Sequence, residues 1–276
     1  MTTLFKILSF WPLGVLHAMG WVMGWVAFMF SGVYRRRFLD NVQQARLLAR
    51  QWLPAVGAAG KLVSELPRLW LGRSVPVQWQ GAQHVDTALA HGKGVVFLTP
   101  HVGCFEVAAT AYAQRYGQHG HPVTVLFRPP RQPWLAPLVI ASRIRPGLNT
   151  APTNLAGVKQ LIKALKKGDC VAVLPDQVPP LGQGLWLPFF GKDAYTMTLS
   201  ARLALQTGAC VLLTWGERLS WGRGYVVHVQ PLDAALSSDL STATAQVNQA
   251  MEHLIMQAPQ QYLWGYARYK MPRENP

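Results

Sequence analysis

The sequence predicts an α/β protein: a single domain with a mostly parallel sheet, preceded by an N-terminal membrane helix. Past Val75, short runs of β-branched residues alternate with helical patterns, which is typical of βαβ units. Before that, the 27 residues from Ile7 to Val33 contain no Asp, Glu, Lys or Arg. The chain has 276 residues, 50% of them hydrophobic, which is enough for one large core. We therefore expect an anchor at residues 1–34 and an α/β domain at 35–276.

The uncharged N-terminal run is expected to be an uncleaved membrane anchor. As one helix it would be about 40 Å long, against about 30 Å for the apolar core of a bilayer. A signal peptide carries its basic residues before the apolar run, whereas here the larger basic cluster, Arg35 to Arg37, follows it. The positive-inside rule then places the domain in the cytoplasm, with a basic helix over Arg35–Arg50 against anionic lipid. Pro12 and four glycines leave crossing and shallow insertion both open, and a buried core helix is the alternative.

The expected strands are short apolar runs, and the clearest helix covers 155–167, where an apolar stripe faces a row of lysines and Gly168 ends the pattern. Segments 131–152 and 175–195 are rich in Pro, Gly and aromatic residues, and we expect them to be active-site loops or lipid-facing flaps. The expected strands are Val75 to Gln80, Gly94 to Thr99, Val123 to Phe127, Cys170 to Leu174, Cys210 to Trp215 and Tyr225 to Gln230.

The charge balance indicates an anionic partner. Lys and Arg number 26 against 12 Asp and Glu, a formal net charge of +14. Only 14% of residues are charged and 11 are Trp, a composition that favours a membrane surface over nucleic acid. Cys104, Cys170 and Cys210 show no metal-ligand spacing and are expected to be reduced thiols, so no metal and no cofactor is predicted.

Charged or titratable side chains follow four of the expected strands where each strand ends. In open parallel sheets the carboxyl ends of the strands face the ligand crevice. One such residue would mean little, but four strand ends together indicate a functional edge more than chance surface polarity. The residues are His101 after Thr99, Arg128 after Phe127, Asp176 after Leu174, and Glu217 with Arg218 after Trp215.

His101 and Glu106 form the candidate catalytic pair. A helix that begins near Gly103 would place Glu106 in its first turn, where the helix dipole keeps the carboxylate anionic. A carboxylate on one imidazole nitrogen fixes the tautomer and makes the other nitrogen a better base for a hydroxyl. The sequence has no GxSxG elbow, so the simplest mechanism is direct attack of a substrate hydroxyl on an acyl thioester.

Several segments taken together resemble one family, the bacterial lipid A late acyltransferases (lauroyl and myristoyl transferases) within the lysophospholipid acyltransferase group. The resemblance covers most of the chain. It is carried by the apolar N-terminal helix, TPHVGCFE at 99–106, LFRPPRQP at 126–133, Arg143-Ile-Arg145, LIKALKKGD at 161–169, LPDQ at 174–177 and QYLWGYARYK at 261–270.

The resemblance implies roles for individual residues. His101 is similar to the catalytic base and Glu106 to its partner in the HxxxxD/E motif, while Arg128, Arg143 and Asp176 resemble substrate-binding positions. An Arg128–Asp176 ion pair that supports the crevice is the structural alternative. The family also implies helices on both faces of the sheet, an apolar tunnel for the acyl chain, and a site at the cytoplasmic face of the bacterial inner membrane. The expected partners are acyl carrier protein as donor, a lipid A precursor as acceptor, and membrane lipid.

Three other functions remain open from the sequence. A glycerolipid acyltransferase shares the histidine step, but that branch uses Asp in the motif and an FPEG-type segment, where this chain has Glu106 and LPDQVPP. A non-enzymatic protein that binds anionic lipid would need no activated histidine. A thioesterase or lipid hydrolase would replace the acceptor hydroxyl with water.

Overall fold

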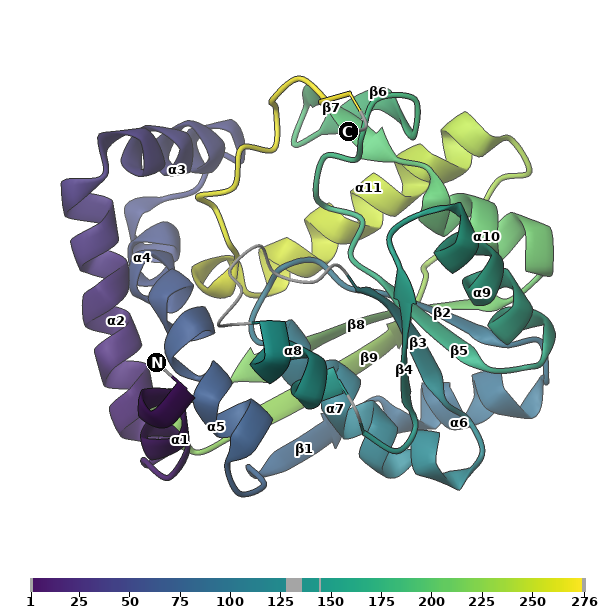
Figure 1. The fold of residues 1–276 in the computed structure, drawn as a ribbon. Helices are drawn as coiled ribbons and strands as arrows, with labels where there is room; N and C mark the ends of the chain where they lie inside the picture. Colours follow the sequence, from purple (N-terminus) through teal and green to yellow (C-terminus); the bar gives the residue numbers. More distant parts are fainter. Residues whose placement is uncertain (1, 128–135, 144, 275–276) are drawn as a thin grey trace.

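The computed structural model describes residues 2–127, 136–143 and 145–274, with the backbone alone at residues 2, 138 and 141–143. A seven-stranded sheet of order β1-β9-β8-β2-β5-β3-β4 forms the centre of this part of the chain (Figure 1). The strands are β1 (Val77–Gln80), β2 (Val95–Leu98), β3 (Val123–Phe127), β4 (Leu148–Pro152), β5 (Cys170–Val173), β8 (Cys210–Arg218) and β9 (Tyr225–Pro231).

The sheet is mostly parallel, as predicted. Strands β8, β2, β5, β3 and β4 run the same way, whereas β9 pairs antiparallel with β8 and β1 follows β9. The four residues of β2 are all buried, which explains their unbroken apolar sequence, because a central parallel strand is covered on both faces. The carboxyl ends of β2, β5 and β3 therefore meet at one edge of the sheet.

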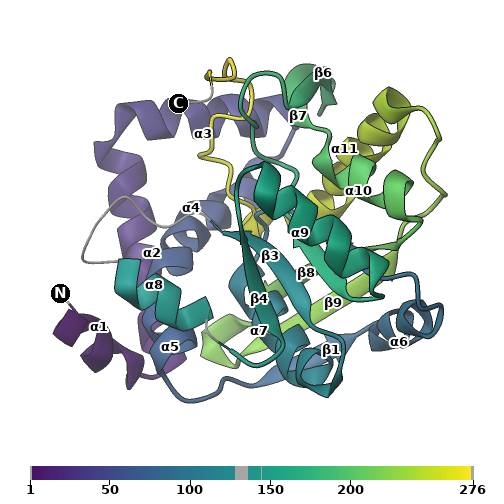
Figure 2. The ribbon, with the colours of Figure 1, turned by 45° about the vertical axis from the view of Figure 1, so that its right-hand side comes forward.

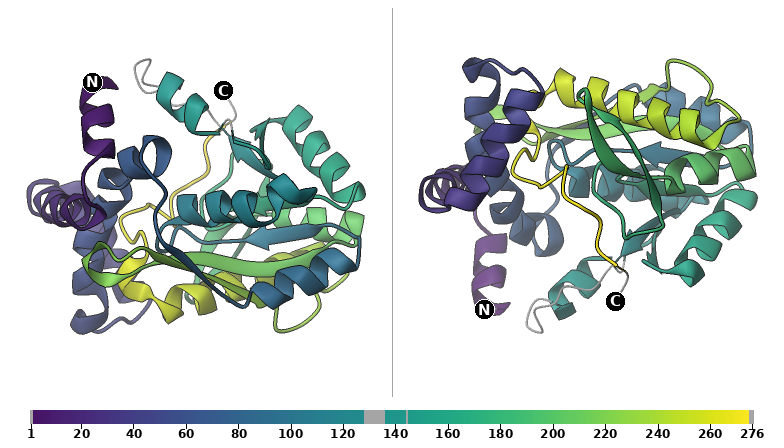
Figure 3. Two further views of the ribbon diagram at one scale, coloured as in Figure 1. Left: turned by 90° about the horizontal axis from the view of Figure 1, so that it is seen from below. Right: turned by 90° about the horizontal axis from the view of Figure 1, so that it is seen from above.

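Helices cover both faces of the sheet, which confirms the predicted fold class. Helices α6 (Ala82–Ala90) and α7 (Phe105–Arg115) share a buried apolar cluster with one face. Helices α9 (Leu155–Lys166), α10 (Leu199–Thr207) and α11 (Leu240–Gln257) share another cluster with the opposite face. The edge-on views in Figure 3 show the sheet between α7 and α11, and Figure 2 brings α9 and α10 forward.

Local sequence signals explain several helix ends. The side chain of Asn154 accepts a hydrogen bond from the N–H of Gly157 and caps α9, and Asp239 caps α11 in the same way through Thr242. Helix α9 ends one residue earlier than predicted, at Lys166, and Gly168 then takes a positive φ of 85°.

The N-terminal region is built of five helices that lie against one end of the α/β domain (Figure 1). Of these, α2 packs along α4. The helices are α1 (Thr2–Ser9), α2 (Leu13–Phe30), α3 (Gly32–Gln44), α4 (Ala49–Ser64) and α5 (Leu66–Leu71).

The sequence predicts one continuous helix over the apolar run from Ile7 to Val33, and this prediction is wrong: the run is divided among α1, α2 and α3. The chain leaves the helical path at residues 10–12, where Pro12 lacks an N–H donor, and again at Ser31, which caps α3 by accepting a hydrogen bond from the N–H of Tyr34. By length and composition α2, at Leu13–Phe30, could cross a membrane. The basic helix predicted over Arg35–Arg50 is also divided, since α3 ends at Gln44.

The two segments expected to be loops contain regular structure. Segment 131–152 includes α8 (Ala136–Arg143) and the edge strand β4. Segment 175–195 includes most of an antiparallel hairpin, β6 (Gly184–Phe189) with β7 (Lys192–Met197), which packs near α11. Proline, glycine and aromatic residues are compatible with an edge strand and a hairpin, and our expectation gave them too much weight as signs of irregular structure.

Candidate active site

His101 lies in a tight turn between β2 and α7 that is held by backbone hydrogen bonds to β8 and to residues 261–263. The backbone N–H groups of Gly103 and Cys104 donate to the carbonyl oxygens of Gln261 and Gly216, at 3.0 and 2.7 Å. Gly103 has φ +60°, and a Cβ atom there would overlap the carbonyl oxygen of Gly216, so the turn requires glycine. The carbonyl oxygen of His101 accepts from the N–H of Leu263 at 3.1 Å. The backbone that carries the imidazole is therefore rigidly placed.

Asp176 is the carboxylate that contacts the imidazole. Its Oδ1 lies 2.7 Å from Nδ1 of His101, and its Oδ2 accepts the backbone N–H of His101 at 2.9 Å. Asp176 follows β5, which pairs with β2, so neighbouring strands bring together two residues that are 75 positions apart in the chain. One buried carboxylate thus holds both the backbone and the ring of the histidine.

The pKa of Asp176 is lowered although the group is buried. Burial alone would raise it, but the charge of His101, hydrogen bonds from its ring and backbone, and the charge of Arg268 together lower the pKa below its usual range. An ionised Asp176 accepts a hydrogen bond from Nδ1, which assigns the N–H of the neutral ring to Nδ1 and leaves Nε2 with a lone pair.

The Nε2 atom of His101 faces a cavity. The side-chain amide nitrogen of Gln177 lies 3.1 Å from it, in position to donate, and the ring of Phe105 packs edge-on at 5.0 Å between centroids. Sequence reasoning missed Gln177, although it directly follows Asp176 in the LPDQ segment. Its place beside a polar residue at a strand end was the available signal.

Glu106 occupies the predicted first turn of α7 but is not the partner of the His101 ring. In the described part of the chain the ring nitrogens contact Asp176 and Gln177. Glu106 is buried, and its Oε2 accepts a hydrogen bond from the indole N–H of Trp70 at 3.3 Å. The pairing expected from the HxxxxE spacing is therefore corrected, because the turn that begins α7 directs the two side chains to different partners.

A cavity of about 1280 Å³ contains His101 and Glu106 in its wall. On one side, positions i, i+3, i+4 and i+7 of α7 line it, with two alanines between two aromatic residues, and they face apolar residues of the sheet. The α7 residues are Phe105, Ala108, Ala109 and Tyr112, and the sheet residues include Phe97, Val125, Ala172 and Val229. The wall also includes polar residues, among them Asn154, which caps α9, together with Gln183 and Arg202.

The remaining predicted residues separate into two groups. Arg128 lies outside the described residues, and for Arg143 the structure describes only the backbone, at the end of α8. Glu217 and Arg218 belong to β8, which is longer than predicted, and neither is among the residues that line the cavity. Glu217 pairs with His228 at 2.8 Å, and Arg218 pairs with the buried Glu65. Their expected place in the crevice is wrong, because β8 continues into a hairpin beyond the edge of the sheet.

The cysteine nearest the histidine is not placed as a nucleophile. Cys104 is fully buried and free, and burial, with the nearby charge of Glu65, raises the pKa of its thiol well above the usual range. The thiol of Cys104 is therefore held in its unreactive, protonated form.

Comparisons with known proteins identify the family. The model of the bacterial lipid A biosynthesis acyltransferase family matches residues 68–271. A lipid A biosynthesis lauroyltransferase of Escherichia coli (strain K12) is 27% identical over 238 residues, which cover 84% of this chain and 75% of that protein. A lipid A biosynthesis palmitoleoyltransferase of the same organism is 26% identical over 192 residues, 69% of this chain and 60% of that protein.

A third relative has a different acceptor in its name. A phosphatidylinositol mannoside acyltransferase of Mycobacterium tuberculosis (strain ATCC 25618 / H37Rv) is 30% identical over 174 residues, 59% of this chain and 51% of that protein. The matched family region contains β2, α7, β5 and the turn that carries His101. The family match covers most of the chain and confirms the resemblance and the expectation of an acyltransferase: the chain belongs to the bacterial lipid A biosynthesis acyltransferase family.

Proposed function

We propose that this protein transfers a fatty acyl chain from an acyl thioester to a hydroxyl of a lipid A precursor, with His101 as the general base. The observation that supports this most directly is the Asp176–His101 contact of 2.7 Å at the wall of a large, partly apolar cavity. A hydroxyl is a weak nucleophile until a base removes its proton, and a carboxylate-held imidazole is suited to that step.

The proposed reaction is a direct transfer. The acceptor hydroxyl replaces Gln177 at Nε2 of His101, and its oxygen attacks the thioester carbonyl while its proton passes to Nε2. The tetrahedral intermediate then expels the thiolate, which takes the proton from the imidazolium, so that an ester and a free thiol form and His101 returns to its neutral state. Asp176 stabilises the imidazolium that exists between these steps.

The apolar wall between α7 and the sheet is proposed to receive the acyl chain. The small side chains of Ala108 and Ala109 leave room beside the sheet, and Tyr112 stands one turn further from His101. The phenol of Tyr112 is held by the carbonyl oxygen of His121 and the thiol of Cys170, both at 3.0 Å. A fixed aromatic ring at that position would limit how far an acyl chain can enter.

The other proposed substrate contacts follow from the family. Glu106 is proposed as a second catalytic carboxylate in the same cavity, with a role separate from orienting His101. Arg128 and Arg143 are proposed to hold the acceptor phosphate or polarise the thioester carbonyl. The donor is proposed to be acyl carrier protein, an acidic partner for a chain of net charge +14, and the site is proposed to lie at the cytoplasmic face of the inner membrane.

The test is transfer from acyl carrier protein to a lipid A precursor by purified protein, compared with its His101→Ala variant. Near-normal transfer by the variant would reject the mechanism, and release of free fatty acid faster than transfer would indicate a thioesterase instead. Mass spectrometry of lipid A from cells with and without the gene should show one missing secondary acyl chain, which identifies the reaction, its position and the chain length together.

The test of the proposed acceptor should include a competing substrate, because the mannoside acyltransferase relative is 30% identical over 59% of the chain. The same assay should therefore present phosphatidylinositol mannoside beside the lipid A precursor at equal concentration. A preference for the mannoside would retain the histidine chemistry and overturn the proposed acceptor.

A further inference from the structure

One face of α2 is a continuous apolar surface that nothing in the described chain covers. Its exposed side chains recur at the spacing of one helical stripe and are all hydrophobic. Helix α1 also has exposed apolar side chains, at Leu4 and Ile7, and the turn Ser220–Gly222 between β8 and β9, which contacts α2, has Trp221 92% exposed. The members of the surface on α2 are Val15, Met19, Val22, Met23, Val26, Met29 and Phe30.

The opposite face of α2 is in backbone contact with α4. A Cβ atom on Gly20 would overlap the backbone of Lys61, and one on Gly24 would overlap the carbonyl oxygen of Val56. Gly60 of α4 approaches Gly20 equally closely. Glycine on both helices therefore lets their backbones pack against each other without side chains between them. Such close packing indicates that α2 and α4 form one fixed unit.

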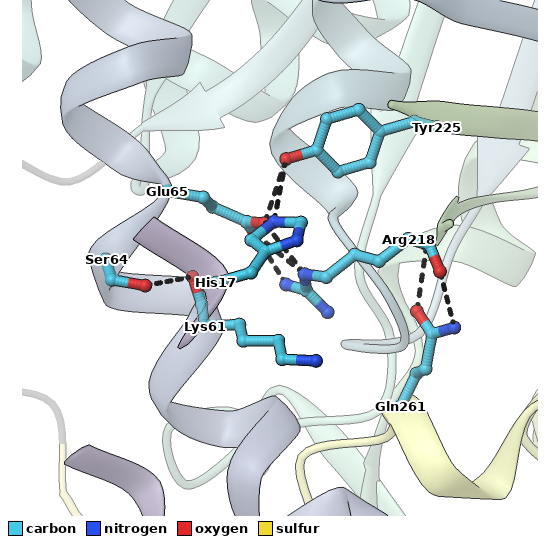
Figure 4. A network of polar contacts seen from close by, with 7 residues as sticks. All are labelled: His17, Lys61, Ser64, Glu65, Arg218, Tyr225 and Gln261. Carbon is cyan, nitrogen blue, oxygen red and sulfur yellow. Dashed lines mark hydrogen bonds and ion pairs between the residues drawn. The ribbon is translucent and has the colours of Figure 1, made fainter. Parts of the chain in front are cut away.

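A buried polar network fastens the first turns of α2 to the domain (Figure 4). Nε2 of His17 lies 3.1 Å from the carboxylate of Glu65. Glu65 also accepts bidentate hydrogen bonds from the guanidinium of Arg218, and one from the hydroxyl of Tyr225 at 3.0 Å. These residues come from α2, the end of α4, β8 and β9, and all are buried. A charged pair of this kind is costly to expose to hydrocarbon or to separate.

The second end of α2 is also attached. Phe28 packs against Phe38 and Trp52, at 5.4 and 6.5 Å between ring centroids. The guanidinium of Arg35 donates to the carbonyl oxygens of Phe28 and Met29, which satisfies acceptors that the end of a helix leaves open. Helix α2 thus contacts the domain at its start, along its middle and at its end.

We propose that α2 lies in the plane of an anionic membrane surface, with its exposed face in the lipid and its buried face on the domain, and does not cross the bilayer. If α2 crossed with its contacts intact, α4 and the Glu65–Arg218 pair would enter the hydrocarbon beside it. If it crossed alone, the buried network would lose His17 and both glycine contacts. The in-plane position keeps every contact and covers the apolar stripe.

Charge at the rim of the surface identifies lipid as the occupant. Arg35, Arg36 and Arg37 are exposed where α2 ends, and Arg223 is exposed beside Trp221 near its start. Basic residues beside an apolar helical face with exposed tryptophan fit anionic headgroups above an acyl layer. A protein partner would not need cations at both ends of an otherwise uncharged stripe.

A depth measurement distinguishes the two arrangements. An environment-sensitive fluorophore is attached to Val15→Cys, Val22→Cys, Met29→Cys or Trp221→Cys in a Cys210→Ser background, since Cys104 and Cys170 are fully buried. Val15 and Met29 are about 21 Å apart along the helix. In phosphatidylglycerol vesicles we expect depth-dependent quenchers to report one shared shallow depth for all four labels. A label at Val22→Cys deeper than those at both ends would overturn the proposal.

Matched charge reversals test the anionic rim. The variant Arg36→Glu with Arg37→Glu should weaken binding to phosphatidylglycerol vesicles at least tenfold and leave the fold of the protein unchanged. The control, Lys166→Glu with Lys167→Glu, alters the same charge on two exposed residues at the carboxyl end of α9, away from α2 (Figure 1), and should bind as the unmodified protein does. Equal loss in both pairs, or a lipid-free dimer that already shields the α2 labels, would reject the bilayer as the occupant.

Discussion

The carboxylate of Asp176 lies 2.7 Å from Nδ1 of His101 and 2.9 Å from its backbone N–H, so one side chain fixes both the ring and the turn that carries it. The geometry has the form of an acid–base dyad, in which the carboxylate sets the tautomer and stabilises the imidazolium. Its energetic weight can be measured, because an amide of the same shape can replace the carboxylate.

Replacing Asp176 with Asn should lower kcat by about 10³- to 10⁴-fold, since the amide can present its N–H to Nδ1 and favour the wrong tautomer. The measurement is initial-rate acyl transfer with purified protein, with circular dichroism to verify folding. The matched control is Asp193→Asn, an exposed position on the β6–β7 hairpin, which should retain full activity. A loss of less than tenfold in Asp176→Asn would show that the contact does not serve the reaction.

Replacing Glu106 with Gln should reduce kcat less, by roughly tenfold to a hundredfold, the value of about one charge-assisted hydrogen bond. The reason is that Glu106 lines the cavity but does not hold the His101 ring. The double variant with Asp176→Asn should lose the product of the two single factors, because the carboxylates act separately. If kcat of the double variant were no lower than kcat of the more impaired single variant, both carboxylates would instead act on the histidine as one unit.

The sequence predicted the strands whose residues are β-branched and buried, because a central parallel strand such as β2 reads as an unbroken apolar run. It missed β4 and the β6–β7 hairpin, whose stability depends on their neighbours more than on local composition. It also joined the end of α1, the whole of α2 and the first residues of α3 into one apolar helix, which the structure interrupts at Pro12 and Ser31. Hydropathy over a window does not detect a single residue that interrupts the hydrogen-bond ladder.

Of the predicted site residues, His101 and Glu106 line one cavity and Asp176 contacts His101, but the sequence assigned the wrong partner to the histidine ring. Spacing along the chain suggested Glu106, five residues away, whereas the order of strands in the sheet places Asp176 beside His101 from 75 residues away. Strand order depends on long-range packing and is not visible in local spacing. The same limit hid the Glu65–Arg218 pair, which joins the end of α4 to the end of β8.

Replacing Ala109 with Leu should shift the donor preference toward shorter acyl chains. Ala109 lines the cavity one turn beyond Phe105, and a larger side chain there would fill space between α7 and the sheet. Competition between thioesters of different length, read by mass spectrometry of the products, measures the shift. Gln114→Leu, an exposed position on the same helix, should leave the preference unchanged. An unaltered length profile in Ala109→Leu would place the acyl chain elsewhere in the cavity.

Replacing Gly103 with Ala should lower both stability and activity. The positive φ of 60° is strained for alanine, and its Cβ would overlap the carbonyl oxygen of Gly216. We expect a loss of about 1–3 kcal/mol in the free energy of unfolding, measured by urea denaturation, and a displaced His101 that lowers kcat. Gly92→Ala is the control: it also has a positive φ, 68°, but open space around its Cβ position. Equal destabilisation in the two variants would attribute the effect to backbone strain alone.

The buried Glu65 should make stability depend on acidic pH. Burial alone would raise its pKa, but the charge of Arg218 and hydrogen bonds from His17 and Arg218 lower the pKa to about 2. A carboxylate whose pKa is lower in the folded state stabilises the fold above its unfolded pKa of about 4.3 and loses that contribution as pH falls toward 2. The free energy of unfolding of the wild-type protein should therefore decrease between pH 5 and pH 2, whereas Glu65→Gln should show a smaller decrease.

The same variant should also be less stable at neutral pH, because removing one partner of a buried pair costs about 3–5 kcal/mol. The control is Glu217→Gln, which should lose much less stability because the carboxylate of Glu217 is partly exposed beside His228. If Glu65→Gln matched the wild-type protein in both respects, the network would not fasten α2 to the domain.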